Sequence, residues 1–259
     1  MIYVDEKSLH SFKKINTLTW DTVKNNVYIR LMNIKSVSHY DKDIAFVKVA
    51  DLAVTFSVQE IDSTEKTLIS HMLTVNELTD YGISVDIADS KALENTLRNR
   101  KRRIISLREY MVMHEVAYPL INISEKVKGG FVNEKQSGII EDISYDDEIE
   151  IENILMLTNK NDIFGACYMI IPEILEEVYK RFGENFYIIP LSIHCVMCVR
   201  NGYATKNNTK PTHEVEDDIL DAIEEFNDTK TNSWKDILSY KAYYYFGDDG
   251  KYIFPISAC

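Results

Sequence analysis

The spacing of apolar residues along this chain changes from segment to segment, and each spacing predicts a different element. Over residues 19–34 apolar positions recur every three or four residues, which predicts a helix with one buried face. Over residues 46–61 apolar and polar positions alternate, which predicts a half-buried strand. A second strand at 67–75 would complete a hairpin, and a further helix is expected from about Ser90.

The second half of the chain carries stronger local signals. Residues 152–171 are typical of a strand, a turn and another strand. Pro172 predicts the start of a helix, because its missing N–H costs least in the first turn, and Gly183 predicts the end of that helix. Residues 185–200 predict two strands with a kink at Pro190, because proline interrupts the hydrogen-bond ladder of a sheet.

The chain closes with a predicted helix at about 213–227 and a hairpin whose turn is Gly-Asp-Asp-Gly at 247–250. Together these elements predict an α+β fold with two lobes, each a mainly antiparallel sheet with helices packed on it. We place the first lobe at residues 1–123 and the second at 153–259. Residues 124–152 are rich in Gly, Lys and acids and should form a flexible connection.

Composition and charge limit the classes of function that we expect for this chain. The chain has 259 residues, 45% of them hydrophobic, which predicts a globular protein. No apolar run is long enough to cross a bilayer and the N-terminus lacks a signal-peptide pattern, so we expect no membrane partner and a cytoplasmic location. The net charge of −12 repels phosphate, which argues against direct nucleic-acid binding and favours a basic protein partner.

The charge is distributed unevenly. Residues 141–152 and 214–228 contain many acids and no base, whereas Arg98–Arg103 (RNRKRR) is almost entirely basic. An ordinary solvated face remains the alternative explanation of each block. The helix predicted at about 213–227 has one apolar face and carries the second of these acidic blocks. The candidate binding residues are Asp217, Asp218, Asp221, Glu224 and Glu225.

Aromatic residues supply a second candidate surface. Tyr243, Tyr244 and Tyr245 occupy adjacent positions of a predicted strand, so at least one of them should face outward. Exposed tyrosine is enriched at protein interfaces, and we add Tyr243 and Tyr245 to the candidate binding residues. An amphipathic aromatic strand with one solvated side is an equally good explanation.

Two short patterns could carry chemistry. Cys195 and Cys198 have the spacing of a redox or zinc pair, but in a strand their side chains diverge, and no second pair of ligands occurs. We therefore expect buried thiols, no metal and no cofactor. Ser192 and His194 would share a strand face, which allows a nucleophile and its base. No P-loop, G-x-G-x-x-G, H-E-x-x-H or G-x-S-x-G motif accompanies them.

Over residues 153–194 the chain resembles an uncharacterised family of bacterial proteins common on phages and conjugative elements of gram-positive gut bacteria. Its members pair an "LTN…GA" hairpin with an "FYILPSSIHE" strand. The matching residues are Leu157, Thr158, Asn159, Gly165, Ala166, Phe186, Tyr187, Pro190, Ser192, Ile193 and His194. This chain departs from the pattern at Leu191 and Cys195, where the family usually has Ser and Glu. The resemblance implies a fold and a mobile-element context, and it implies no activity.

These observations predict a non-enzymatic binding protein of a mobile element. Its acidic surface would bind a basic protein, for example a nucleic-acid-binding protein of a host defence system that it inhibits. The first alternative is a small hydrolase or nucleotide-processing enzyme that uses Ser192 and His194. The second is a nucleic-acid contact through Arg98–Arg103.

Overall fold

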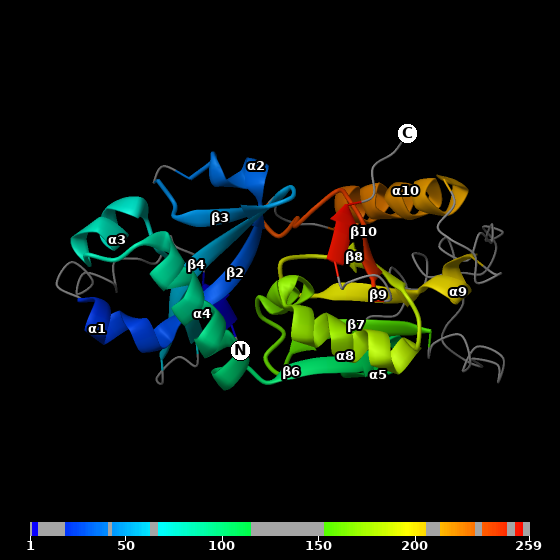
Figure 1. Cartoon of the computed structure of the whole chain (residues 1–259), viewed down its shortest axis with the longest axis horizontal. Coiled ribbons are helices and arrows are strands. Elements are labelled where there is room, and N and C mark those ends of the chain that lie inside the picture. The colour runs from blue at the N-terminus through cyan, green and yellow to red at the C-terminus, as the bar shows by residue number, and fades with distance from the viewer. Residues whose placement is uncertain are drawn as a thin grey trace. The chain divides into compact units, whose positions relative to one another are not determined.

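In a computed structural model of the protein, the strands gather in two separate sheets, and helices pack on each of them (Figure 1). The structure describes residues 2–4, 19–40, 43–62, 67–114, 153–205, 213–230, 235–247 and 252–255. Residues 1–101 with 159–161 form one unit, and residues 102–158 with 162–259 form the other. The predicted α+β class with mainly antiparallel sheets is confirmed.

The first sheet has the strand order β1-β5-β4-β2, and β3 also pairs with β4. Its strands are Ile2–Val4 (β1), Val27–Asn33 (β2), Phe46–Val49 (β3), Leu52–Asp62 (β4) and Thr67–Met72 (β5). Its helices are Trp20–Val23 (α1), Ile34–Val37 (α2), Val75–Asp80 (α3) and Val85–Asn99 (α4), with a 3₁₀ turn, η2, at Lys24–Asn26. The predicted hairpin is confirmed as β4 and β5, and β3 is a separate strand before it.

The helix predicted over residues 19–34 is wrong beyond its first turn. α1 ends at Val23, and β2 pairs with β4 along its whole length. Val27, Ile29 and Leu31 are buried on one face of β2 with a period of two, and Val27 and Leu31 also fit the helical spacing. Pairing with β4 decides between the two periods, because every residue of β2 has a partner in the ladder with β4.

Strand β4 is buried on both faces, whereas the alternation predicted a half-buried strand. Val54 lies on the apolar face, and Thr55, Ser57 and Gln59 on the other face are buried as well. These polar side chains find partners inside the unit. Thr55 Oγ1 donates to the carbonyl oxygen of Arg30 (2.9 Å), and Gln59 Nε2 donates to Ser57 Oγ (2.6 Å). Internal hydrogen bonding therefore makes the second face compatible with burial.

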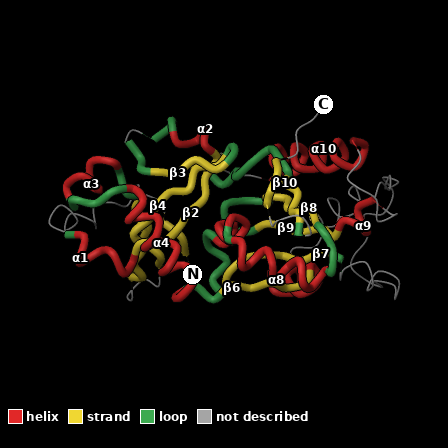
Figure 2. Tube along the Cα trace, in the orientation of Figure 1, coloured by secondary structure: helices red, strands yellow, loops and turns green. Residues whose placement is uncertain are grey.

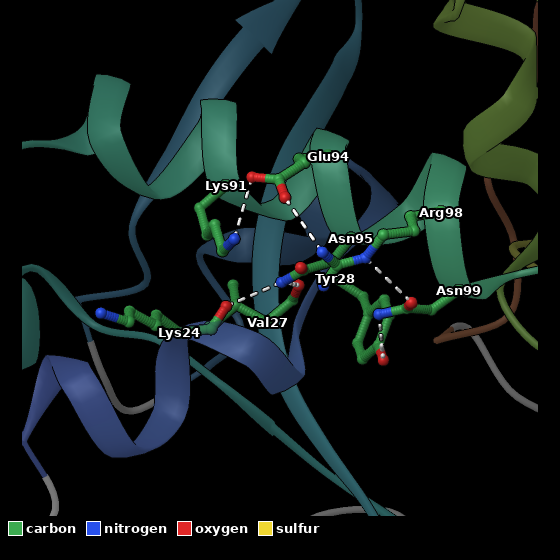
Figure 3. A network of polar contacts seen from close by, with 8 residues as sticks. All are labelled: Lys24, Val27, Tyr28, Lys91, Glu94, Asn95, Arg98 and Asn99. Atoms are coloured by element: carbon green, nitrogen blue, oxygen red, sulfur yellow. Dashed lines mark hydrogen bonds and ion pairs between the residues drawn. The ribbon is translucent and has the colours of Figure 1, made fainter.

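Helix α4 closes the open edge of this sheet at β2 (Figure 3). Asn95 Nδ2 donates to the carbonyl oxygens of Lys24 (2.7 Å) and Val27 (2.9 Å). The backbone N–H of Ile29 donates to Thr96 Oγ1 (3.1 Å). Both Asn95 and Thr96 are buried. An unpaired edge strand invites association with other chains. The side chains of Asn95 and Thr96 bond backbone groups at this edge that a neighbouring strand would otherwise bond.

Helix α3 begins with a capping box that a buried histidine extends. The backbone N–H and the hydroxyl of Thr74 donate to Glu77 Oε2 (2.8 and 2.9 Å), and the N–H of Glu77 donates back to Thr74 Oγ1 (3.2 Å). Glu77 Oε1 lies 2.7 Å from Nε2 of His71. Burial raises the pKa of Glu77, but the contacts with His71 and Thr74 together outweigh it, so the pKa is lowered overall.

The second sheet has the strand order β11-β10-β8-β9-β7-β6. Its strands are Arg102–Ser106 (β6), Ile154–Asn159 (β7), Phe186–Pro190 (β8), Val196–Arg200 (β9), Tyr243–Phe246 (β10) and Tyr252–Pro255 (β11). Its helices are Leu107–His114 (α5), Pro172–Phe182 (α8), Asn201–Thr205 (α9) and His213–Lys230 (α10), with a 3₁₀ helix, η3, at Gly165–Ile170. Over the described ranges, no helix is both long and apolar enough to cross a bilayer.

Most local predictions in this unit are confirmed. α8 begins at Pro172 and ends before Gly183, which adopts the left-handed conformation (φ 71°). The two strands of 185–200 and the final hairpin are present as β8, β9, β10 and β11. The strand expected after the turn in 152–171 is wrong, because the 3₁₀ helix η3 occupies that position.

Helices cover both faces of the second sheet (Figure 2). On one face, residues of α5 and α10 join a single apolar cluster with the strands. Its members include Leu107, Ile154, Met156, Tyr187, Ile189, Met197, Val199, Ile219, Ala222, Ile223 and Tyr244. On the other face, Phe182 of α8 contacts Phe186 (5.7 Å between ring centroids), and Tyr179 contacts Tyr245 (6.1 Å). The sheet therefore has no solvated face along its central strands.

The division between the units lies at Lys101 and Arg102, earlier than the predicted connection at 124–152. Residues 102–114 form β6 and α5, and β6 extends the second sheet beside β7. These residues therefore belong with the second unit, although the prediction placed them in the first lobe. The expected connection itself lies outside the described residues.

Replacing Glu77 with glutamine should lower the free energy of unfolding by about 1–3 kcal/mol at pH 7, because the amide loses a charge-assisted contact with His71. The pKa of Glu77 is lowered in the folded state, so its contribution is present above the ordinary value of 4.5 and disappears as the pH falls through the lower folded value. Urea unfolding at neutral and strongly acidic pH measures both effects.

The matched control is Asp21→Asn, which removes an exposed carboxylate paired with Lys24. An exposed pair contributes little, so this variant should unfold close to the wild type. Equal stability of Glu77→Gln and wild type at pH 7 would show that the buried pair with His71 does not stabilise α3.

Candidate functional site

Helix α10 has a buried face and an outward face of different chemistry. Ile219, Ala222 and Ile223 are buried in the cluster on the second sheet. From residue 216 to residue 228, every exposed position is an aspartate or a glutamate. These positions are Asp217, Asp218, Asp221, Glu224, Glu225 and Asp228, and we call them the acidic face of α10. The predicted helix is confirmed, and its candidate binding residues lie on its exposed side.

Within the described ranges, no ion pair engages four of the six acids of this face. None of the ion pairs in the described ranges involves Asp217, Asp221, Glu224 or Asp228. Several of the acids also follow one another at a spacing of four residues, for example Asp217 with Asp221 and Glu224 with Asp228. Side chains at this spacing are neighbours on a helix, so their charges repel.

Helix α8 packs on the same sheet with a different outer surface. Lys180 Nζ lies 3.1 Å from Glu176 Oε1, and Arg181 Nη2 lies 3.4 Å from Glu177 Oε1. Both pairs have the four-residue spacing that stabilises a helix. Burial of one helix face against this sheet is therefore compatible with mixed charges on the other face.

Tyr243 and Tyr245, which we predicted as exposed contacts, are buried. Their exposed fractions are 2% and 1%, and Tyr244 between them is 3% exposed. The expectation that one of three adjacent strand residues faces solvent holds only for a sheet with an open face. β10 pairs with β8 and with β11 in a sheet whose two faces are covered by helices. These tyrosines are core residues and do not belong to a binding surface.

Ser192 and His194 lie in the turn between β8 and β9. β8 ends at Pro190 and β9 begins at Val196, so the strand face that the two residues were predicted to share does not exist. Ser192 Oγ accepts a hydrogen bond from the backbone N–H of His194 (3.0 Å). A serine that bonds the backbone two residues later stabilises a turn. This contact gives Ser192 a structural role.

The imidazole of His194 is held by another segment of the chain. The backbone N–H of Phe164 donates to Nδ1 (3.1 Å), and the phenyl ring of Phe164 stacks on the imidazole (5.5 Å between centroids). Because Nδ1 accepts, the neutral ring carries its proton on Nε2, which lies 3.9 Å from Asp236 Oδ1. A base for Ser192 needs an unprotonated nitrogen directed at its hydroxyl. These contacts give the proposed nucleophile and base no support.

Gly165 allows the loop after β7 to pack directly against this turn. A Cβ atom on Gly165 would lie 2.6 Å from the carbonyl oxygen of His194 and 2.7 Å from Cα of Thr158. Thr158 Oγ1 lies within hydrogen-bond distance of the same carbonyl (3.1 Å) and of Asp162 Oδ1 (3.2 Å). The two sequence motifs that carry the family resemblance therefore meet in the fold.

Asp162 lies close to polar side chains that were not predicted as site residues from the sequence. Its Oδ2 lies 3.5 Å from Nε2 of His114 and 3.7 Å from Nη1 of Arg103, and the ring of Tyr110 contacts that of His114 at a tilt (4.3 Å between centroids). Asp162 itself has a left-handed backbone (φ 52°), a conformation that tertiary contacts must support in most residues. These residues come from β6, α5 and a loop, so no sequence spacing connects them.

Cys195 and Cys198 are separate, buried thiols. Cys195 lies in the turn and packs in the cluster under α10, whereas Cys198 lies in β9 beside Met197 and points to the other face. Burial raises the pKa of both thiols, although hydrogen bonds with Tyr110 and Ser192 oppose this at Cys195. Both are free, and no group of three metal-ligating side chains occurs within the described part of the chain.

The basic run Arg98–Arg103 is engaged in contacts inside the two units. Four of its side chains, Arg98, Arg100, Arg102 and Arg103, each have an acidic or aromatic partner (Figure 3 shows the first). The partners, in that order, are Glu94 (3.4 Å), the ring of Tyr28 (4.6 Å to its centroid), Glu177 (2.7 Å) and Asp162 (3.7 Å). These guanidinium groups already have partners within the protein, and a nucleic acid would have to compete for them.

Replacing Gly165 with alanine should lower the free energy of unfolding by about 2–3 kcal/mol, because the methyl group would meet backbone atoms that have no room to move. Gly183→Ala is the matched control. Unlike Gly165, Gly183 has a left-handed backbone (φ 71°), but its added Cβ would meet no atom within 4 Å, so only the backbone strain remains and the cost should be about 1 kcal/mol. Urea unfolding of both variants, followed by circular dichroism, measures the difference. Equal losses would contradict the close approach at Gly165.

A family model described as a family of unknown function, DUF5688, matches residues 1–246. This match agrees with the resemblance to an uncharacterised family. No curated protein and no solved structure matches the chain.

Proposed function

The chain belongs to DUF5688, a family of unknown function, and from its surface chemistry we propose that it is a non-enzymatic binding protein whose acidic face of α10 engages a basic protein. The observation that carries the proposal is that every exposed position from Asp217 to Asp228 holds a carboxylate. Such a surface attracts and orients a positively charged partner and repels nucleic acid.

The energetics of α10 support a role beyond solubility. Like charges four residues apart destabilise a helix by about 0.2–0.5 kcal/mol for each pair, and Asp217 with Asp221 and Glu224 with Asp228 are two such pairs. Acids in the last turns also oppose the helix dipole, and Glu225 and Asp228 lie near the C-terminal end at Lys230. A mixed surface like that of α8 would avoid both costs. A binding surface explains why they are tolerated.

The charge distribution favours a protein over a nucleic acid as the partner. The formal net charge is −12, and the one strongly basic run has its arginines engaged within the protein. A protein that binds nucleic acid through its own basic surface has the complementary charge pattern, since that surface is built to hold rows of negative charge. Nucleic-acid-binding proteins are therefore the class of partner that we put first.

The biological setting of the proposal comes from the resemblance to proteins of phages and conjugative elements. In that setting the partner would be a host defence protein, for example a nuclease, and occupation of its basic surface by α10 would inhibit it. This step rests on an analogy of context, and the binding surface itself does not depend on it.

Reversing four acids of α10 (Asp217, Asp221, Glu224 and Asp228, each to lysine) should reduce partner binding about tenfold or more, because it replaces attraction by repulsion. The control reverses four exposed acids elsewhere (Glu60, Asp80, Asp86 and Glu173, each to lysine), which changes the net charge by the same amount. Each immobilised protein is incubated with lysate of a bacterial host, and retained proteins are quantified by mass spectrometry.

Wild type and the control should retain the same basic protein, and increasing salt should release it. If the α10 variant retains that protein at the wild-type level, the acidic face of α10 is not the binding surface. Retention that is lost equally in both variants would show that net charge alone governs the binding.

The α10 variant should be at least as stable as the wild type. The new lysines still repel one another at the pairs 217/221 and 224/228, but they form favourable pairs with retained acids, such as position 221 with Glu225, and those at 224 and 228 suit the negative end of the helix dipole. Thermal unfolding followed by circular dichroism measures this. A clear loss of stability would mean that these acids serve the fold, and would undercut the argument that they are kept for binding.

A further inference from the structure

His194 and Phe164 form a contact that depends on the protonation state of the imidazole. Nδ1 of His194 accepts the backbone N–H of Phe164 at 3.1 Å, so the contact requires an unprotonated Nδ1. A protonated imidazole is a donor at both nitrogens and accepts no hydrogen bond. Protonation would therefore place an N–H opposite the N–H of Phe164.

The Phe164 backbone is strained while this contact is made. Its φ is 57°, in the left-handed region, where a bulky side chain is rarely found. Such a conformation costs about 1–2 kcal/mol for an L-residue and persists only where surrounding contacts enforce it. The hydrogen bond to His194 and the stacking of the two rings are two of those contacts. Loss of the hydrogen bond removes one of the contacts that hold the Phe164 backbone in the left-handed conformation.

An alternative partner for the charged imidazole lies on its other side. Nε2 of His194 is 3.9 Å from Oδ1 of Asp236, and the carbonyl oxygen of Asp236 accepts the backbone N–H of Ile193 at 3.0 Å, which fixes this segment beside the turn. A carboxylate at this distance attracts an imidazolium more strongly than a neutral ring. Acid therefore weakens one contact of His194 and strengthens the other.

The other titratable groups around the turn act differently. Cys195 next to His194 is buried with its pKa raised, so it remains a neutral thiol. Asp162 approaches the turn through Thr158, and His114 and Arg103 face Asp162. Protonation of His114 would strengthen its contact with Asp162 and break no hydrogen bond with Phe164, whereas protonation of His194 removes the acceptor of the Phe164 N–H. The two histidines can therefore be separated by experiment.

We propose that His194 is a pH-sensitive latch for the loop that follows β7. The neutral imidazole accepts the N–H of Phe164 and holds the loop against the β8–β9 turn. The imidazolium releases Phe164 and moves its contact to Asp236, so the loop opens at mildly acidic pH, where imidazoles take up a proton. This device is independent of the acidic face of α10 and does not require the proposed binding function.

Amide hydrogen exchange of the full chain, followed by NMR between pH 8 and pH 5.5, tests the latch. The protection factor of the Phe164 amide should fall about tenfold on acidification, with the midpoint of the His194 ring titration. The Ala166 amide, which donates to the carbonyl oxygen of Ile193 (3.4 Å), does not involve the imidazole and serves as an internal reference. Its protection should change much less.

Two variants complete the test. His194→Gln offers an amide oxygen that does not titrate, so the protection of Phe164 should become independent of pH. His114→Gln should keep the wild-type fall. The latch is overturned if Phe164 in the wild type keeps its protection at pH 5.5, or if its midpoint follows His114. If His194→Gln does not fold, the wild-type comparison of Phe164 with Ala166 still decides.

Discussion

The second sheet is covered by helices on both faces, and this constraint determines what its helices can present to solvent. α8 and α10 each bury an apolar stripe against the strands, so only their outer residues remain available for other roles. On α8 these residues form pairs of opposite charge at helical spacing, whereas on α10 they are acids without exception between Asp217 and Asp228. Amphipathic packing alone does not require this difference, and the acidic face therefore needs an explanation of its own.

Elements with a local signal could be predicted from the sequence. α8 has a proline at its start and a glycine at its end, and α10 has one apolar stripe and one acidic stripe. The assignment of β2 failed because Val27 and Leu31 fit both a helical and a strand period, and only pairing with the distant β4 decides between them. The strand predicted after β7 failed for a related reason, since the buried residues of η3 carry no period of their own.

The candidate site shows the same division between local and long-range information. Periodicity was sufficient to place Asp221 and Glu224 on the outside of α10, because a helix fixes its faces over a few residues. It was insufficient for Tyr243 and Tyr245, since alternation separates two faces without saying whether a helix covers each of them. The partners of His194 could not be predicted at all, because Phe164 and Asp236 reach it only through the packing of loops.

The loop after β7 and the β8–β9 turn form one structural feature, although 30 residues separate Phe164 from His194. Each side supplies what the other lacks. Gly165 has no side chain, so the backbone of the turn can approach, and the imidazole of His194 offers the acceptor that stabilises a left-handed Phe164. Because the strain at Phe164 is local and its support is distant, neither segment is expected to keep its conformation alone. The two short motifs at these segments are therefore best understood as the two halves of a single contact.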